Sequence, residues 1–414
     1  MLKKPIINTL VQVGGKIVTV LLSLVTTAIL TRKLGVEVYG NYLLITSVWL
    51  LLDSAVDFGS KVIGVKEASI KENNQRNEIY IQVAWFRCLT SLLFFVVGIG
   101  IILFWSGFDG LEIEALMALL MIGFTAIAGS LEIIFQTEMR MDLKVWGDII
   151  FPLIFVVFLV ISGNGVNLTW VFGVYLLARI LSLGVSCGLV KRIINKIKIE
   201  KINKTFLVNF LKNTWPMGVY MILFSGYDRA VDSVLIKQLI GVRDLAYYGL
   251  AYKVYGNLIQ PAYFLINSVF PLLSGKTENK RKLFWQTSGL MLLGALIVAP
   301  TIYFLAPLIV RVLAGSEYVA SIGILRILLV AMVFAYLGHL VGFTLIAQGK
   351  QKIILLIGII SLIVNIGGNL LFIPRFGIEG AAWVTVATEA IAGFLMIIFL
   401  RKNPLVPIDR DILP

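Results

Sequence analysis

The chain has 414 residues, of which 59% are hydrophobic and 14% are charged, and its mean hydropathy is +0.93. A soluble domain of this length would carry more charge, so the composition excludes a soluble protein. The formal net charge is +13, but the Lys and Arg residues lie in short polar intervals between apolar runs rather than in one basic stripe. This arrangement is typical of a membrane protein and argues against nucleic-acid binding.

Twelve apolar runs are long enough to cross a membrane, because a helix needs about 20 apolar residues to span the hydrocarbon core. We expect the first set near residues 10–31, 39–60, 80–104, 115–135, 146–162 and 169–190. We expect the second set near residues 214–236, 246–270, 284–306, 322–346, 353–373 and 378–400. The sequence therefore predicts an all-α polytopic membrane protein with about 12 transmembrane helices.

Basic residues are unequally divided between the two sides of the predicted bundle. With the N-terminus inside, about 24 of them face the cytoplasm and about six lie outside, which is a strong bias by the positive-inside rule. The outer ones are Arg32, Lys33, Lys237, Arg243, Arg311 and Arg375. We therefore expect both termini to be cytoplasmic.

The longest polar interval, residues 191–213, falls midway along the chain and divides the predicted spans into two equal sets. We expect two lobes, residues 1–200 and 201–414. The alternating Ile and Lys residues of this interval suggest an interfacial amphipathic helix, and a linker whose lysines only set the topology is the alternative. A weak internal repeat supports two lobes: Leu34–Gly40 and Ile240–Gly249 both begin near a Gly and end in Tyr-Gly.

One motif near the C-terminus resembles a known signature. The run Ile373–Trp383, preceded by Asn365 and Asn369, is similar to the "N…N…IPxxGIxGAA" signature of polysaccharide-transport proteins. These are the lipid-linked oligosaccharide flippases (Wzx type) of the multidrug/oligosaccharidyl-lipid/polysaccharide superfamily. Looser similarities to the same family lie in Leu34–Gly40, in Phe135–Arg140 and in the FLKNTWPM run before span seven.

The resemblance implies both a fold and a substrate. It implies two six-helix lobes around a central cavity, in the cytoplasmic membrane of a bacterium or archaeon. It implies that an undecaprenyl-pyrophosphate-linked oligosaccharide repeat unit is flipped from the inner to the outer leaflet by alternating access. Membrane lipids would surround a monomer that works beside a glycan polymerase. Which pathway it would serve, O-antigen, capsule, exopolysaccharide or teichoic acid, stays open.

Ionisable groups inside predicted spans are costly and are by default hypotheses about function. The basic ones are Lys16, Arg87, Arg179, Arg229, Lys253 and Arg326, and the acidic ones are Asp53, Asp57, Asp228, Asp232 and Glu389. The two numbers nearly balance, so mutual pairing is the alternative to a functional role. For Lys16 we expect a structural pair with Asp53 or Asp57, and Arg326 lies near an outer helix end, where it can snorkel.

Four deeper cations suit the phosphates of the substrate that the resemblance implies. Arg binds phosphate by bidentate hydrogen bonds, and Lys binds it as a point charge. We expect this role for Arg87, Arg179, Arg229 and Lys253. The alternative is that they pair with Asp228, Asp232 or Glu389.

A second set of polar residues suits a small cation. Asp228 and Asp232 are four residues apart and share a face of helix seven, and Asn365 and Asn369 repeat this spacing on helix eleven. Carboxylate and amide oxygens are suitable hard ligands, so we expect a coupling site for a sodium ion or a proton. Hydrogen bonds and salt bridges between helices are the alternative. His339, the only histidine, is interpreted as a packing residue, with a proton relay as the alternative.

The sequence carries no sign of catalysis. The GxxxxGK[ST] phosphate-binding loop is missing, Cys88 and Cys187 lack a CxxC spacing, and the outer loops are too short for a membrane glycan polymerase. We expect no cofactor and no metal site. The prediction is a transporter rather than an enzyme, with a multidrug exporter of the same superfamily as the alternative to a flippase.

Overall fold

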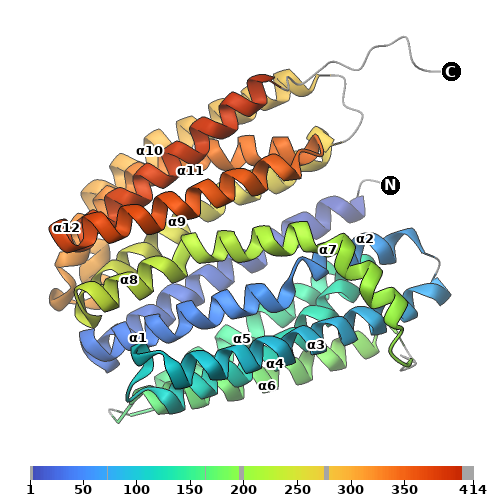
Figure 1. Ribbon diagram of the computed structural model, residues 1–414, viewed down its shortest axis with the longest axis horizontal. Helices are drawn as coiled ribbons and strands as arrows, with labels where there is room; N and C mark the ends of the chain where they lie inside the picture. Colours follow the sequence, from blue (N-terminus) through green and yellow to red (C-terminus); the bar gives the residue numbers. More distant parts are fainter. Residues whose placement is uncertain (1–2, 72, 164, 195–199, 275–278, 403–414) are drawn as a thin grey trace. The chain divides into compact units, whose positions relative to one another are not determined.

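The computed structural model describes residues 3–71, 73–163, 165–194, 200–274 and 279–402, and within these ranges it is helical without strands (Figure 1). Eight helical stretches are long and apolar enough to cross a membrane. The predicted all-α polytopic membrane fold is therefore confirmed. By its contacts the chain forms two compact units, Met1–Gly226 and Tyr227–Pro414.

The first unit is built from seven α-helices, of which the first is broken. They are α1 (Lys3–Asp57), α2 (Ser60–Ile70), α3 (Asn73–Phe104), α4 (Glu112–Thr137), α5 (Met141–Ile161), α6 (Leu168–Lys191) and α7 (Lys204–Ser225). Gly35, with φ 71°, interrupts α1, so α1 contains one complete span and most of the next. α2 continues that second span after a further break at Phe58 and Gly59.

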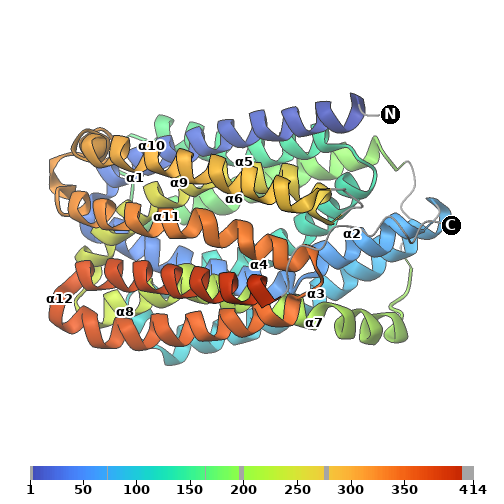
Figure 2. The same ribbon diagram turned by 90° about the horizontal axis from the view of Figure 1, so that it is seen from above.

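The second unit follows a short π-helical segment, Gly226–Ala230. Its helices are α8 (Val231–Leu239), α9 (Val242–Ser274), α10 (Lys280–Ala314), α11 (Ala320–Ala347) and α12 (Gln351–Lys402). α11 packs against α9, α10 and α12, and both views show it beside α12 (Figures 1 and 2). Among the described residues, the eight stretches hold ten spans, because two of them contain a break. The α7–α8 stretch and α9 bring the number to the predicted twelve.

By contacts, the first compact unit extends to Gly226, and the predicted lobe boundary at residues 200 and 201 stays a prediction. α7 belongs to the first unit because it packs against α1, α2 and α3. Phe210 of α7 is buried, and its ring centroid lies 5.1 Å from the ring centroid of Phe86. The predicted amphipathic segment, 191–213, includes residues 195–199, which lie outside the described part, and its later residues begin α7.

The C-terminal motif forms a tight turn between two spans. The chain reverses at Gly377, whose φ is 59°, and the helix runs past Pro374 as far as this glycine. A Cβ on Gly380 would lie 2.6 Å from the backbone oxygen of Phe372. The two spans therefore approach each other closely where glycine allows it, as expected for small residues between membrane helices.

Adding a methyl group at Gly380 is expected to destabilise the second unit. The group it would meet is backbone rather than a movable side chain, so Gly380→Ala should lower the free energy of unfolding by about 1–3 kcal/mol. Gly367→Ala is the matched control on the same helix, because nothing lies within 4 Å of a Cβ there. Thermal unfolding in detergent measures both, and equal melting temperatures would contradict the close approach at Gly380.

Candidate functional site

Arg179 lies among aromatic rings inside the first unit. Its guanidinium carbon is 3.9 Å from the ring centroid of Phe151 and 5.7 Å from those of Trp49 and Tyr175. Tyr175 is one turn earlier on α6, Phe151 is on α5 and Trp49 is on α1, so three packed helices form this aromatic cage. Aromatic faces stabilise a cation electrostatically but do not neutralise its charge.

No counter-charge meets Arg179 in the described part of the chain. It takes part in no salt bridge there, and its buried Nε has no hydrogen-bond partner. An unmet buried donor costs about 1–3 kcal/mol, and more when charged. Arg179 is therefore a cation whose donors can still bind an oxyanion.

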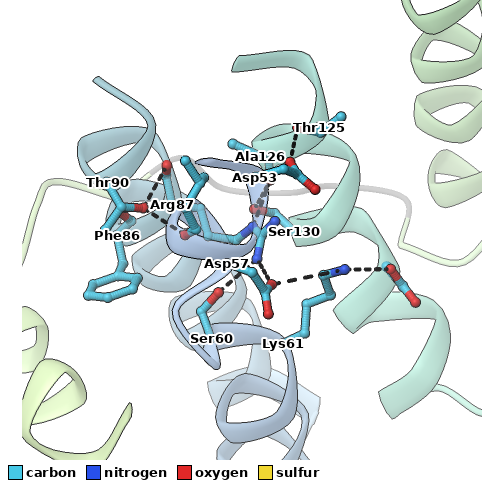
Figure 3. Close-up of polar contacts among 12 residues, drawn as sticks. Asp53, Asp57, Ser60, Lys61, Phe86, Arg87, Thr90, Thr125, Ala126 and Ser130 are labelled. Atoms are coloured by element: carbon cyan, nitrogen blue, oxygen red, sulfur yellow. Dashed lines mark hydrogen bonds and ion pairs between the residues drawn. The ribbon is translucent and has the colours of Figure 1, made fainter. Parts of the chain in front are cut away.

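Arg87 has the opposite environment, since it is 2% exposed and fully engaged. Its Nη1 donates to the Asp57 carboxylate and, at 2.8 Å, to the Ser60 hydroxyl, while its Nε donates to the Ala126 carbonyl at 2.8 Å (Figure 3). These contacts account for Arg87 without any substrate, and its phosphate-binding role stays a prediction. Asp57 thus pairs with Arg87, and the predicted pairing of Lys16 with Asp53 or Asp57 stays a prediction.

The ion pairs extend from this position to the surface of the first unit. Lys61 lies 4.0 Å from Asp57 and 3.5 Å from Glu132. Lys144 lies 3.1 Å from Glu132 and 2.8 Å from Asp148. Positive and negative side chains alternate along this row, so these charges compensate one another.

Arg229 and Lys253 are the other two residues that the sequence predicts to bind phosphate. Lys253, in α9, is half-buried and interacts with other groups of the protein. The side chains of Arg229 and Asp228 lie outside the described part, although their backbone forms the π-helical segment. A phosphate-binding role for Arg229 and Lys253 stays a prediction.

A buried carboxylate is the centre of the polar residues in the second unit. Asp232, in the first turn of α8, is 1% exposed. Its Oδ1 accepts from the Nδ2 atoms of Asn369 at 2.7 Å and Asn365 at 3.1 Å. Its Oδ2 accepts from the hydroxyls of Tyr248 at 2.5 Å and Thr385 at 3.4 Å. α8, α9 and both spans of α12 thus meet at one carboxylate.

Two oxygens beside this carboxylate have no donor. The Oδ1 atoms of Asn365 and Asn369 are buried, and neither has a hydrogen-bond partner among the described residues. Leaving a buried acceptor unpaired costs about 1–3 kcal/mol each. Carboxylate, amide and hydroxyl oxygens are the types of ligand that a small hard cation prefers.

The structure brings together three of the four residues predicted for ion coupling: Asp232, Asn365 and Asn369. Tyr248 and Thr385 complete the cluster, and the sequence did not single them out for it. In the sequence, Tyr248 stands out only as part of the internal repeat. Thr385 follows the C-terminal motif, one turn after Ala381. Whether the cluster couples an ion to transport stays a prediction.

His339 packs in the second unit. Its Nε2 lies 3.2 Å from the Tyr263 hydroxyl, and the two ring centroids are 4.8 Å apart. This hydrogen-bonded packing corresponds to the first of its two predicted roles.

The sequence pattern of a family described as polysaccharide biosynthesis protein matches residues 6–277, more than half of the chain. The chain belongs to this family. Among curated relatives, the uncharacterized membrane protein MJ1068 of Methanocaldococcus jannaschii is 27% identical over 225 residues. That match covers 51% of this chain but only 43% of the relative.

Solved transporters share the fold of this chain. An inward-facing multidrug resistance MATE family transporter of the MOP superfamily has a TM-score of 0.79 at 15% identity, covering 95% of this chain and 98% of that one. The lipid II flippase MurJ, in an inward closed conformation, has a TM-score of 0.76 at 16% identity, covering 95% and 87%. The predicted fold is thus confirmed, and at such low identity the likeness extends to the fold alone.

Proposed function

We propose that this protein is a flippase that moves an undecaprenyl-pyrophosphate-linked oligosaccharide repeat unit from the inner to the outer leaflet of the cytoplasmic membrane. Its family connects it with polysaccharide biosynthesis, and the similarity in fold to a lipid II flippase supports a lipid-linked substrate. Two lobes would expose the substrate site to each leaflet in turn. Both termini would be cytoplasmic, and a monomer would work beside a glycan polymerase.

Arg179 is the observation that carries this proposal. A diphosphate that leaves water needs charged donors, and a guanidinium supplies two parallel ones. Arg179 has a charge stabilised by Phe151, Trp49 and Tyr175 and no acidic partner among the described residues. We infer that it binds the diphosphate.

A multidrug exporter is the second candidate, because a multidrug transporter has the higher TM-score of the two solved structures. Its cationic drugs would need a carboxylate that they can reach, and Asp232 is only 1% exposed. Arg179 would instead repel them. The charge of the site therefore favours an anionic substrate.

Asp232, with Asn365, Asn369 and Thr385, would hold a sodium ion or a proton that drives the cycle. A bound sodium ion would satisfy the two amide oxygens that have no donor. It would bias the second unit between states only through its different affinity for them. The membrane potential would add a second driving force, since an anionic head group moving outward gains about 2.3 kcal/mol per charge per 100 mV.

Reconstituted vesicles separate the two candidates. We expect the purified protein to move an undecaprenyl-pyrophosphate oligosaccharide with a fluorescent sugar between leaflets, measured as loss of the label's accessibility to an external quencher. The same vesicles should not accumulate the cationic dye ethidium. Accumulation of ethidium without movement of the labelled glycan would replace the flippase with the exporter.

A further inference from the structure

The second membrane-crossing stretch of the first unit has a break with unusual backbone geometry. α1 ends at Asp57 and α2 begins at Ser60. Between them, Phe58 and Gly59 have φ values of 43° and 73°. Positive φ is uncommon for a residue with a bulky side chain, and it persists only where the surroundings hold it.

A single guanidinium contacts both helix ends at this break. Nη1 of Arg87 donates to Asp57, the last residue of α1, and to Ser60, the first residue of α2 (Figure 3). Its Nε donates to the carbonyl of Ala126 on α4. Because the guanidinium is planar and its donors have fixed directions, the two helix ends are held to one rigid group that α4 anchors.

Neighbouring residues are fitted to this arrangement. A Cβ on Gly129 would lie 2.2 Å from Nη2 of Arg87, so only glycine leaves room for the side chain. Thr90, one turn after Arg87 on α3, places its hydroxyl 3.0 Å from the Val56 carbonyl, besides carbonyls of its own helix. An unbroken helix would pair that carbonyl with the Ser60 N–H, so Thr90 supplies the donor that the break removes.

α7 packs directly on the same break. A Cβ on Gly218 would lie 2.5 Å from the Phe58 ring, and a Cβ on Gly59 would lie 2.9 Å from Met217 Cβ. The angle between α1 and α2 therefore determines the surface on which α7 lies. α7 is also the last helix of the first unit before the π-helical segment.

We propose that Arg87 is a positioning residue that clamps α1 and α2 at a fixed angle and so holds the surface for α7. This role goes beyond the proposed flippase activity and does not depend on it. A simpler role would be to neutralise Asp57, which is buried. Lysine would meet that simpler need, but its single ammonium group has no rigid fork with which to hold Asp57, Ser60 and Ala126 together.

Spin labels on the two sides of the break test the clamp. In full-length protein with Cys88 and Cys187 changed to Ala, labels at Glu37 and Val62, both exposed, lie on the order of 40 Å apart along the two helices. Electron–electron double resonance in lipid vesicles measures their distance distribution. We expect a narrow distribution in the parent and one about two-fold broader in Arg87→Lys, as for a loosened hinge.

Two further variants keep the test decisive if Arg87→Lys folds poorly. Ser60→Ala removes only the contact to α2 and should also broaden the distribution. Arg140→Lys is the matched control, since Arg140 pairs with Asp142 at 2.9 Å and is 40% exposed, and it should leave the distribution narrow. Unchanged width in both Arg87→Lys and Ser60→Ala, or equal broadening in the control, would overturn the clamp. Because the readout is a distance, it is independent of any flipping assay.

Discussion

Arg179→Gln is expected to slow glycan flipping by about 10- to 100-fold, because hydrogen bonds to a charged group contribute about 1.5–3 kcal/mol. Glutamine retains polarity and part of the length, but it lacks the charge and the guanidinium fork. Arg179→Lys should recover part of the rate, since the charge returns without bidentate geometry. The initial rate of label protection in reconstituted vesicles measures each variant.

A matched arginine separates substrate binding from loss of a cation–π contact. Arg326 also stacks on an aromatic ring, 4.5 Å from the Tyr303 centroid, and donates to the Tyr303 carbonyl. Arg326→Gln should therefore flip the glycan at the parent rate. If Arg179→Gln did so as well, at normal abundance and melting temperature, Arg179 would not bind the diphosphate.

Asp232→Asn is expected to uncouple the protein from its ion. The change conserves shape while it removes the charge that Asn365, Asn369, Tyr248 and Thr385 surround. Sodium chloride, compared with choline chloride, should raise the melting temperature of the parent protein, since a ligand at 100 times its Kd stabilises by about 2.7 kcal/mol. The variant should show no such rise.

Transport gives the second readout for this site. Flipping by the parent protein should accelerate under an imposed sodium or proton gradient. Asp232→Asn should flip the glycan at the same rate with either gradient as without one. Asp148→Asn is the control, because Asp148 is a half-exposed carboxylate that pairs with Lys144 in the first unit. If the parent responds to membrane potential but to neither gradient, the Asp232 cluster is structural and the charge of the substrate supplies the direction.

Some features follow from local sequence because their physical cause is local. Long apolar runs predict membrane helices, since only a helix satisfies its own backbone in hydrocarbon. The spacing of Asn365 and Asn369 places both side chains on one helix face, and Asp232 was grouped with them for its chemistry. Gly377 of the C-terminal motif lies at the turn between two spans, and its positive φ is a conformation that glycine adopts readily.

Other features depend on partners that are distant in sequence. Arg87 and Arg179 are both arginines inside apolar runs, and nothing nearby distinguishes them. The tertiary structure gives Arg87 the carboxylate of Asp57, whereas Arg179 receives three aromatic rings.

The extent of the compact units and the full set of residues around Asp232 likewise depend on tertiary contacts. The longest polar interval predicts a lobe boundary near residue 200, whereas the compact unit that contains α7, with Phe210 buried, extends to Gly226 because of contacts between helices. Tyr248 and Thr385 reach Asp232 only because α9 and the last span of α12 pack against α8. By itself the sequence determined the class of protein, the spans and their family, because hydropathy and short motifs are local. Which charges are paired, and which remain available to a substrate or an ion, was decided by helix packing alone.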